Sequence, residues 1–240
     1  MKKIIIPLLL ASFVLVPYTA SGEPVQNLVS NFGNLDVNLK IILFITIISL
    51  APAILITLTA FTRIVIILSL LRNALGTPQT PPNQVIIALS LFLTFFVMKP
   101  VFNKIDDVAI KPYMDKQITD IEAINRSIEP IKEFLINNTR KEDMKLFIDL
   151  SGENVKSPSE LSMITLIPAF IISEVKTAFI VVFVIYLPFI VIDMLVASIL
   201  MSMGMMMIPP MMLSLPFKLI LFVLSDGWEL LIKAIIGSYR

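Results

Sequence analysis

Residues 41–61 read IILFITIISLAPAILITLTAF and contain no charged side chain. A helix needs about 20 apolar residues to cross the hydrocarbon layer of a membrane, so this run predicts a membrane-class segment. The apolar sequence resumes after Arg63 and continues over residues 64–71. Prolines and glycine in residues 76–82 then forbid a continued helix, and a second apolar segment follows over residues 85–98. We therefore expect a first hydrophobic helical hairpin block over residues 23–102.

The composition of the whole chain also differs from that of a soluble domain. Of the 240 residues, 57% are hydrophobic and 15% are charged, whereas ordinary soluble domains carry about 25% charged residues. The net charge of +1 provides no basic field to attract nucleic acid. The chain has no histidine and no cysteine, which excludes histidine acid–base chemistry, thiolate metal sites and disulfides. We expect a protein that is not an enzyme and needs no cofactor or metal.

The charged residues are concentrated in one part of the chain. More than half of them lie in residues 104–160, which predicts a polar insert over residues 103–160. Apolar residues recur there at helical spacing, which predicts short amphipathic helices. Examples are Ile128, Ile131, Phe134 and Leu135, and then Met144, Leu146, Phe147 and Leu150.

The second hydrophobic block covers residues 161–240. Pro168, Pro188 and Pro216 fall inside its apolar segments, as Pro52 does in the first block, and each is expected to bend or break its helix. The predicted fold is therefore all-α and of the membrane-protein class. It consists of kinked hydrophobic helical hairpins with a polar helical insert.

Residues 1–22 have the build of a cleavable secretory signal. Lys2 and Lys3 precede an apolar stretch over residues 4–16, and small residues follow at 19–22. We expect the mature chain to begin near residue 22 or 23, the alternative being an uncleaved membrane helix. The connection that carries Arg63 and Arg72 has no acid, so the positive-inside rule places it in the cytoplasm and the insert in the periplasm.

Four charged residues stand apart in the second apolar block: Glu174, Lys176, Asp193 and Lys218. Glu174 and Lys176 are two residues apart, on opposite faces of a helix, so they cannot pair with each other. An ionisable group at membrane depth is costly without a partner. We expect Glu174 to pair with Lys218, within or between subunits. These charges would either lock helices around a pore or lie at interfacial helix ends.

Two short patterns suggest catalysis without histidine. Ser173-x-x-Lys176 matches the pattern of penicillin-recognising enzymes, and Asp193 with Asp226 could form an aspartyl pair. No further motif of either class accompanies them, so a non-enzymatic protein remains the preferred interpretation.

Residues 201–212 read MSMGMMMIPPMM and hold seven of the thirteen methionines. Methionine is unbranched and adapts to changing shapes, while Gly204 and Pro209-Pro210 interrupt a helix. The stretch therefore predicts a deformable apolar loop that could seal a passage of variable width. The alternative is ordinary core filling.

Longer motifs resemble the FliP family of flagellar biosynthesis proteins from about residue 41 to the C-terminus. They are FTRIVI (61–66), LRNALGTP (71–78), PPNQV (81–85), LFLTFF (91–96), SEVKTAF (173–179), GMMM (204–207), LPFKL (215–219) and DGW (226–228).

The resemblance implies a subunit of the type III protein export gate in the inner membrane, within the flagellar basal body. Several copies, five by the family pattern, would enclose a pore together with FliQ and FliR, with FlhB and FlhA as further partners. Unfolded flagellar proteins would pass, and Met205, Met206 and Met207 would form the gasket. The hairpins would pack within that assembly, above the plane of the bilayer. Alternatives are the homologous subunit of a virulence injectisome and an ion or small-solute channel.

Overall fold

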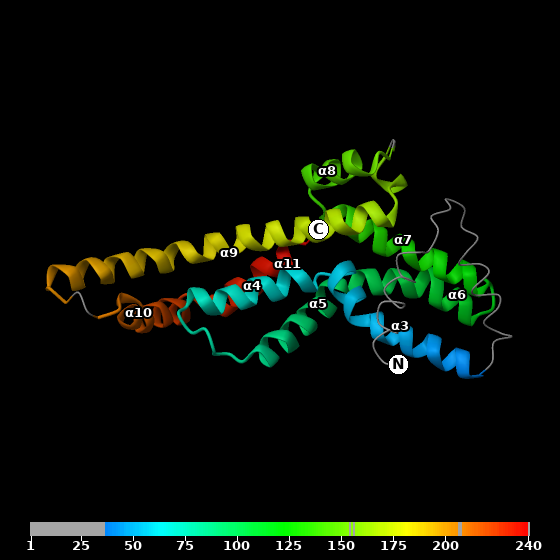
Figure 1. The fold of residues 1–240 in the computed structure, drawn as a ribbon. Coiled ribbons are helices and arrows are strands. Elements are labelled where there is room, and N and C mark those ends of the chain that lie inside the picture. The colour runs from blue at the N-terminus through cyan, green and yellow to red at the C-terminus, as the bar shows by residue number, and fades with distance from the viewer. Residues whose placement is uncertain (1–36, 154, 156, 206–207, 240) are drawn as a thin grey trace, which may run out of the picture. The chain divides into compact units, whose positions relative to one another are not determined.

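The structure is a computed structural model of the chain. It describes residues 37–239 except 154, 156, 206 and 207, so the expected signal segment lies outside the described residues. The chain divides into two compact units, residues 1–47 and 48–240. Every regular element in the described residues is a helix, which confirms the all-α prediction (Figure 1).

The first apolar segment is broken rather than continuous. Helix α3 (Val37–Leu58) and helix α4 (Phe61–Ala74) are separated by two residues, and the axis of Ile48–Leu58 makes an angle of 73° with that of α4. The uncharged run over residues 41–61 is therefore divided at residues 59–60, and the helix after this break continues past Arg63 to Ala74. The Thr62 hydroxyl donates to the Ile56 carbonyl at 2.6 Å, and the Thr59 hydroxyl donates to the Leu55 carbonyl. These hydroxyls satisfy carbonyls near the helix end, so the break needs no proline or glycine.

The second apolar segment begins where the sequence predicted it. Helix α5 (Asn83–Ile105) follows the proline-rich connection and continues through a π-helical turn, η1 (Asp106–Ile110), into helix α6 (Lys111–Met114). Together they form one helix of 32 residues. The expected boundary at residue 103 is therefore not a helix end, because the polar sequence starts on the same helix as the apolar one.

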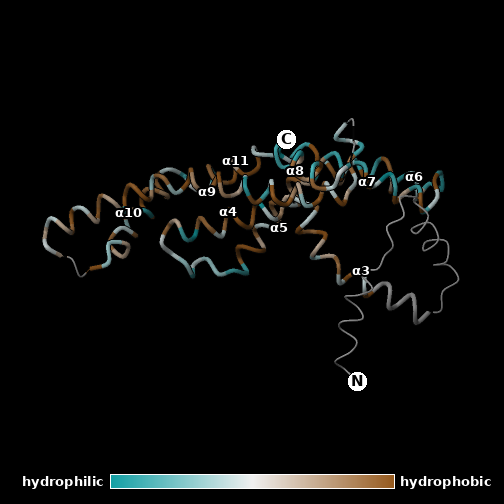
Figure 2. The backbone as a smooth tube through the Cα atoms, turned by 45° about the horizontal axis from the view of Figure 1, so that its top comes forward, coloured by the Kyte–Doolittle hydropathy of each residue, from teal (hydrophilic) through white to brown (hydrophobic). Residues whose placement is uncertain are grey.

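The amphipathic helices expected in the polar stretch are present. Helix α7 (Asp120–Asn138) begins at Thr119, whose side chain accepts the Glu122 N–H at 3.3 Å. Helix α8 (Lys141–Ser151) and a short 3-10 turn, η2 (Pro158–Glu160), follow. Phe134 and Leu135 turn inward from α7. In Figure 2 the hydrophilic colour gathers over α6, α7 and α8, whereas α9 is mostly hydrophobic.

The second block contains one very long helix. Helix α9 (Met163–Ser202) runs for 40 residues through Pro168 and Pro188, and helix α10 (Pro210–Leu224) runs through Pro216. Of the bend or break expected at these prolines, the break does not occur. A proline removes one backbone hydrogen bond at a cost of about 3 kcal/mol, which apolar packing along a helix can exceed. Helix α11 (Gly227–Gly237) completes the chain.

Among the residues that the structure describes, two helices are long and apolar enough to cross a membrane: Asn83–Met114 and Met163–Ser202. The bent pair of α3 and α4 counts as a third if it is one broken span.

The core forms where α4 packs against α9, and α7 closes it. Fully buried side chains there are Ile64, Ile67, Leu71, Leu135, Leu166 and Phe170. The Phe134 ring meets Phe170 edge-on, with centroids 5.9 Å apart. Burying each such side chain contributes about 1.5–3 kcal/mol, so this region fixes α9 relative to α4.

The start of α9 depends on one carboxylate in the preceding loop. Glu153 accepts the hydroxyls of Ser162 at 2.5 Å and Thr165 at 2.6 Å, and these bonds hold the pKa of Glu153 below its ordinary value of 4.5. Because its pKa is lowered by folding, Glu153 stabilises the helix start above pH 4.5 and loses this effect as the pH falls through the folded pKa.

We therefore expect amide hydrogen exchange at residues 162–165, corrected for its intrinsic pH dependence, to accelerate as the pH falls below 4.5. The variant Glu153→Gln should exchange quickly at neutral pH and lack this additional acid dependence. Equal protection in Glu153→Gln and the unaltered chain at neutral pH would contradict the assignment.

Candidate functional site

A buried ion pair joins the α3–α4 break to α9. The Arg63 guanidinium pairs with the Glu174 carboxylate, and both side chains are almost wholly buried. The Tyr239 hydroxyl lies 3.0 Å from Glu174 Oε2 and 3.0 Å from the carbonyl oxygen of Ala60, which belongs to the break. The Arg63 guanidinium also lies 4.0 Å from the centre of the Tyr239 ring, a cation–π contact. The bend, the middle of the core and the end of the chain thus meet in one cluster.

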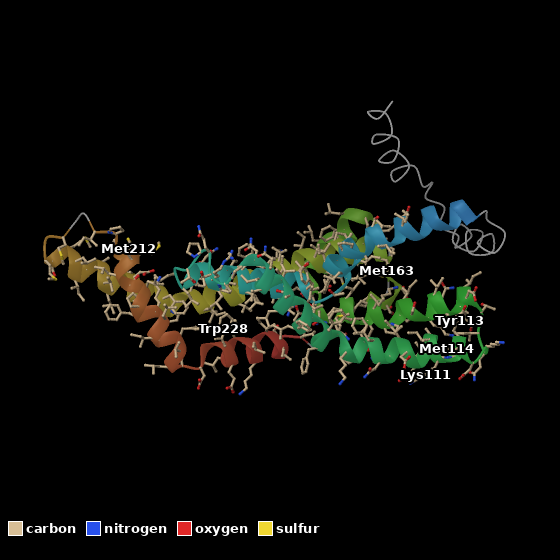
Figure 3. All side chains as sticks on the ribbon, turned by 90° about the horizontal axis from the view of Figure 1, so that it is seen from below. Lys111, Tyr113, Met114, Met163, Met212 and Trp228 are labelled. Atoms are coloured by element: carbon tan, nitrogen blue, oxygen red, sulfur yellow. The ribbon has the colours of Figure 1, made fainter. Side chains whose placement is uncertain are left out.

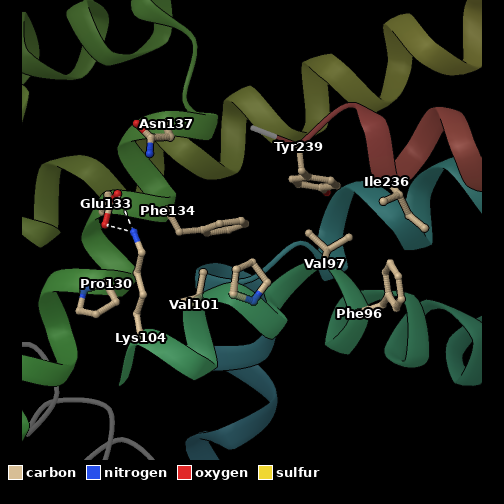
Figure 4. Close-up of a pocket in the computed structure, with 11 residues that line it drawn as sticks. Phe96, Val97, Val101, Lys104, Pro130, Glu133, Phe134, Asn137, Ile236 and Tyr239 are labelled. Carbon is tan, nitrogen blue, oxygen red and sulfur yellow. Dashed lines mark hydrogen bonds and ion pairs between the residues drawn. The ribbon is translucent and has the colours of Figure 1, made fainter. Parts of the chain in front are cut away.

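Further contacts anchor the C-terminal segment. Arg63 donates to the carbonyl oxygen of Ser238 at 3.0 Å and to its hydroxyl at 2.9 Å. The Tyr239 ring stacks on Phe134, with centroids 6.2 Å apart. Figure 4 shows both rings beside a cavity of about 450 Å³, at whose edge Lys104 and Glu133 form an exposed ion pair.

A second cluster ties the α9–α10 hairpin to the end of α4. Lys218 Nζ lies 2.6 Å from Asp193 Oδ2 and 3.3 Å from the carbonyl oxygen of Ala74. The Ser214 hydroxyl donates to the other oxygen of Asp193 at 2.5 Å. Ala74 is the last residue of α4, where the helix dipole favours a cation. The Lys218 side chain, which belongs to α10, therefore links α10 to both α9 and α4.

A third ion pair links α9 to α8. Lys176, which is half exposed, pairs with the buried carboxylate of Asp143. Ser173 is fully buried, and its hydroxyl accepts the Arg140 N–H at 2.9 Å. Ser173 and Lys176 are thus each engaged with the region that joins α7 to α8. This arrangement is structural and does not present a nucleophile beside a base.

The predicted pairing of Glu174 with Lys218 is wrong within the chain. Glu174 pairs with Arg63, and Lys218 pairs with Asp193. Sequence reasoning treated Arg63 as a loop charge that reports topology, but its side chain is buried. The sequence did contain a sign that Arg63 is buried and paired. Arg63 stands between two uncharged runs, so it needs a partner as much as Glu174 does. Nothing in the sequence pointed to Tyr239.

The methionine-rich turn lies between α9 and α10. Gly204 adopts a left-handed conformation there, with φ of +73°, and open space surrounds it. Met201, Met203, Met211 and Met212 are between 60% and 70% exposed, and Figure 3 shows Met212 beside the turn. Met205 is partly buried, and Met206 and Met207 lie outside the described residues. The four exposed side chains do not fill the core of this chain.

The described residues give no support to metal or aspartyl chemistry. Over residues 37–239, apart from the four undescribed positions, no three histidine, cysteine or acidic side chains gather as metal ligands would. Both oxygens of Asp193 are already engaged by Lys218 and Ser214, and Asp226 lies at the start of α11. Asp193 is therefore held as an ion-pair partner.

Several residues of these clusters belong to the motifs that resemble the FliP family. Comparison with known proteins shows whether the chain belongs to that family. The sequence model of the FliP family matches residues 44–235. The chain belongs to the FliP family. It is a flagellar biosynthesis and export component with membrane-class helices.

Similar proteins cover most of the chain. It is 52% identical over 211 residues to the flagellar biosynthetic protein FliP of Aquifex aeolicus, covering 87% of this chain and 88% of that protein. It is 51% identical over 207 residues to the flagellar biosynthetic protein FliP of Bacillus subtilis, covering 86% and 94%. With the protein of that name from Pectobacterium carotovorum it shares 49% identity over 219 residues, covering 91% and 85%.

Proposed function

We propose that the chain is a pore-forming subunit of the flagellar protein export gate. Several copies, five by the family pattern, assemble with FliQ and FliR and work with FlhB and FlhA. The assembly passes unfolded flagellar proteins across the inner membrane at the flagellar basal body, and the polar insert faces the periplasm. The subunit acts as a conduit, without an enzymatic step or a cofactor. The flagellar names of the three relatives favour this role over an injectisome.

The observation that carries the proposal is a cluster of exposed methionines at the end of an anchored hairpin. Core methionines would be buried, whereas the four side chains at 201, 203, 211 and 212 are largely exposed. The body of the hairpin is fixed to α4 through Lys218 and Asp193. A fixed body that carries exposed methionines at its tip suits a seal, because methionine side chains adapt to the shape of whatever touches them.

The length and surface of α9 support an assembly rather than a lone span. Its 40 residues at a rise of about 1.5 Å each extend for about 60 Å, twice the hydrocarbon thickness of about 30 Å. Large side chains that it leaves exposed include Phe179, Phe183, Leu187, Val191 and Leu195. Lipid can cover only about half of this length. Neighbouring chains in an assembly can cover the apolar face of the part that extends past the hydrocarbon layer.

Replacing Met205, Met206 and Met207 together by alanine tests the seal. The assembly should still form, because the described methionines on either side of positions 206 and 207 do not belong to the core of the chain, but it should leak ions and slow growth when expressed. Conductance of the reconstituted assembly measures the leak. Met114→Ala is the control, because that methionine is 74% exposed but belongs to α6. An assembled alanine variant that stays ion-tight would make core filling in the assembly the better account.

Replacing the same three residues by isoleucine separates sealing from passage. Isoleucine is as apolar as methionine, so ions should remain excluded. Its branched side chain is stiff at χ1 and conforms poorly to a passing polypeptide, so secretion of filament proteins should fall. Wild-type secretion by this variant would show that side-chain flexibility is unimportant.

A further inference from the structure

A cavity of about 360 Å³ lies between α4, α5 and α11, away from the methionine turn. Its lining is almost entirely apolar and includes Leu68, Leu75, Val85, Ile86 and Trp228. Arg72 is the one charged residue that lines it. Ligand sites of about 300–1,000 Å³ commonly have this make-up, with apolar walls and a few polar groups that fix orientation.

Arg72 keeps an uncompensated charge at this cavity. Its guanidinium donates to the Pro81 carbonyl at 3.0 Å and to Asn83 Oδ1 at 2.7 Å, and both acceptors are neutral. Its Nε is buried without a hydrogen-bond partner. Within the part of the chain that the structure describes, no carboxylate lies within ion-pair distance of Arg72. Arg72 is partly buried, and a partly buried cation without a counter-charge favours an anionic ligand group.

We propose that this cavity binds an anionic phospholipid. One acyl chain lies in the apolar cavity, and the headgroup phosphate sits on the Arg72 guanidinium. Trp228, partly exposed at the cavity and the one tryptophan of the chain, sits at headgroup level, where tryptophan is favoured. Figure 3 shows Trp228 near the start of α11. This site goes beyond the export role and does not depend on it.

A phospholipid fits these features better than a protein segment does. The chain has membrane-class helices, so lipid is the abundant amphiphile around it. Basic pockets between membrane helices recognise anionic headgroups. The cavity joins one cation to a nearly pure apolar wall, which matches the single anion and the hydrocarbon chain of such a lipid.

Trp228 provides a direct readout, because fluorescence from the one tryptophan reports only this site. The full chain is reconstituted in vesicles with phosphatidylglycerol or phosphatidylcholine that carry the same brominated acyl chains, which quench tryptophan on contact. Brominated phosphatidylglycerol should reach Trp228 with about fivefold higher apparent affinity, the effect of one cation near an anionic headgroup. Raising the salt from about 0.1 M to about 1 M should remove most of this preference.

Variants assign the preference to Arg72. In Arg72→Gln the two lipids should quench equally, whereas Arg72→Lys should keep most of the preference. The matched control is Arg126→Gln, which removes an exposed cation from α7 and should leave the preference unchanged. Val85→Phe, at the half-exposed wall of the cavity, should reduce quenching by both lipids.

Three results would overturn the proposal. One is equal affinity for the two lipids in the unaltered chain, or a preference that Arg72→Gln leaves intact. Another is displacement of the brominated lipid by inorganic phosphate alone, which would make this a simple anion site. The third is loss of quenching when the chain-to-lipid ratio is raised, which would show that protein covers the cavity.

Discussion

Replacing Glu174 by alanine should lower the free energy of unfolding by about 3–5 kcal/mol, because the Arg63 guanidinium is then buried without a counter-charge. Tyr239 loses one of its two acceptors in the same variant. Denaturant unfolding of the detergent-solubilised chain, followed by circular dichroism, measures the change. Because the cluster holds the bend at Ala60, assembly with companion subunits should fall as well.

Two comparisons make this expectation specific. Glu133→Ala removes a carboxylate from an ion pair whose side chains are both 54% exposed, and should cost less than about 1 kcal/mol. Replacing Arg63 and Glu174 together by leucine should recover much of the loss, since no unpaired buried charge remains. A Glu174→Ala variant as stable as Glu133→Ala would show that the cluster does not hold the fold.

A crosswise charge exchange should be more damaging still. Glu174→Lys places a cation beside Arg63, and Lys218→Glu places a carboxylate beside Asp193. Each change should cost about 3–5 kcal/mol, and the double variant should cost about the sum, because the two clusters share no residue. Unfolding free energies of the two single variants and the double variant measure this directly.

The corresponding exchange within one cluster is the control. Asp193→Lys combined with Lys218→Asp keeps opposite charges together and should be more stable than either single change. If instead the crosswise double variant of Glu174 and Lys218 were more stable, or assembled better, than its single variants, those two residues would pair between copies and the assignment of the clusters would be incorrect.

Much of the fold follows from local sequence signals. The proline-rich connection before α5 could be predicted because proline forbids helix continuation, and α7 and α8 could be predicted from their spacing of apolar residues. The break before α4 could not, because it contains no proline or glycine and depends on threonine hydroxyls. Pro168 and Pro188 do not end α9, which continues through both, so a proline inside a long apolar run does not by itself mark a helix end.

The ion pairs show where sequence reasoning reaches its limit. The cost of an isolated charge identified Glu174 and Lys218 as residues that need partners. Their actual partners depend on which helices are neighbours. Arg63 and Glu174 lie 111 residues apart in the chain, and only the packing of α4 on α9 brings them together.

Capture of an export substrate at the methionine turn tests the central claim most directly. A photo-reactive amino acid replaces Met205 in cells that express a substrate fused to a domain too stable to unfold, which stalls the chain in transit. The account predicts a cross-link to the stalled substrate at Met205 and none at Leu150, a 71% exposed position on α8. A substrate cross-link at Leu150 with none at Met205, in cells that still export the unfused substrate, would contradict a path through this turn.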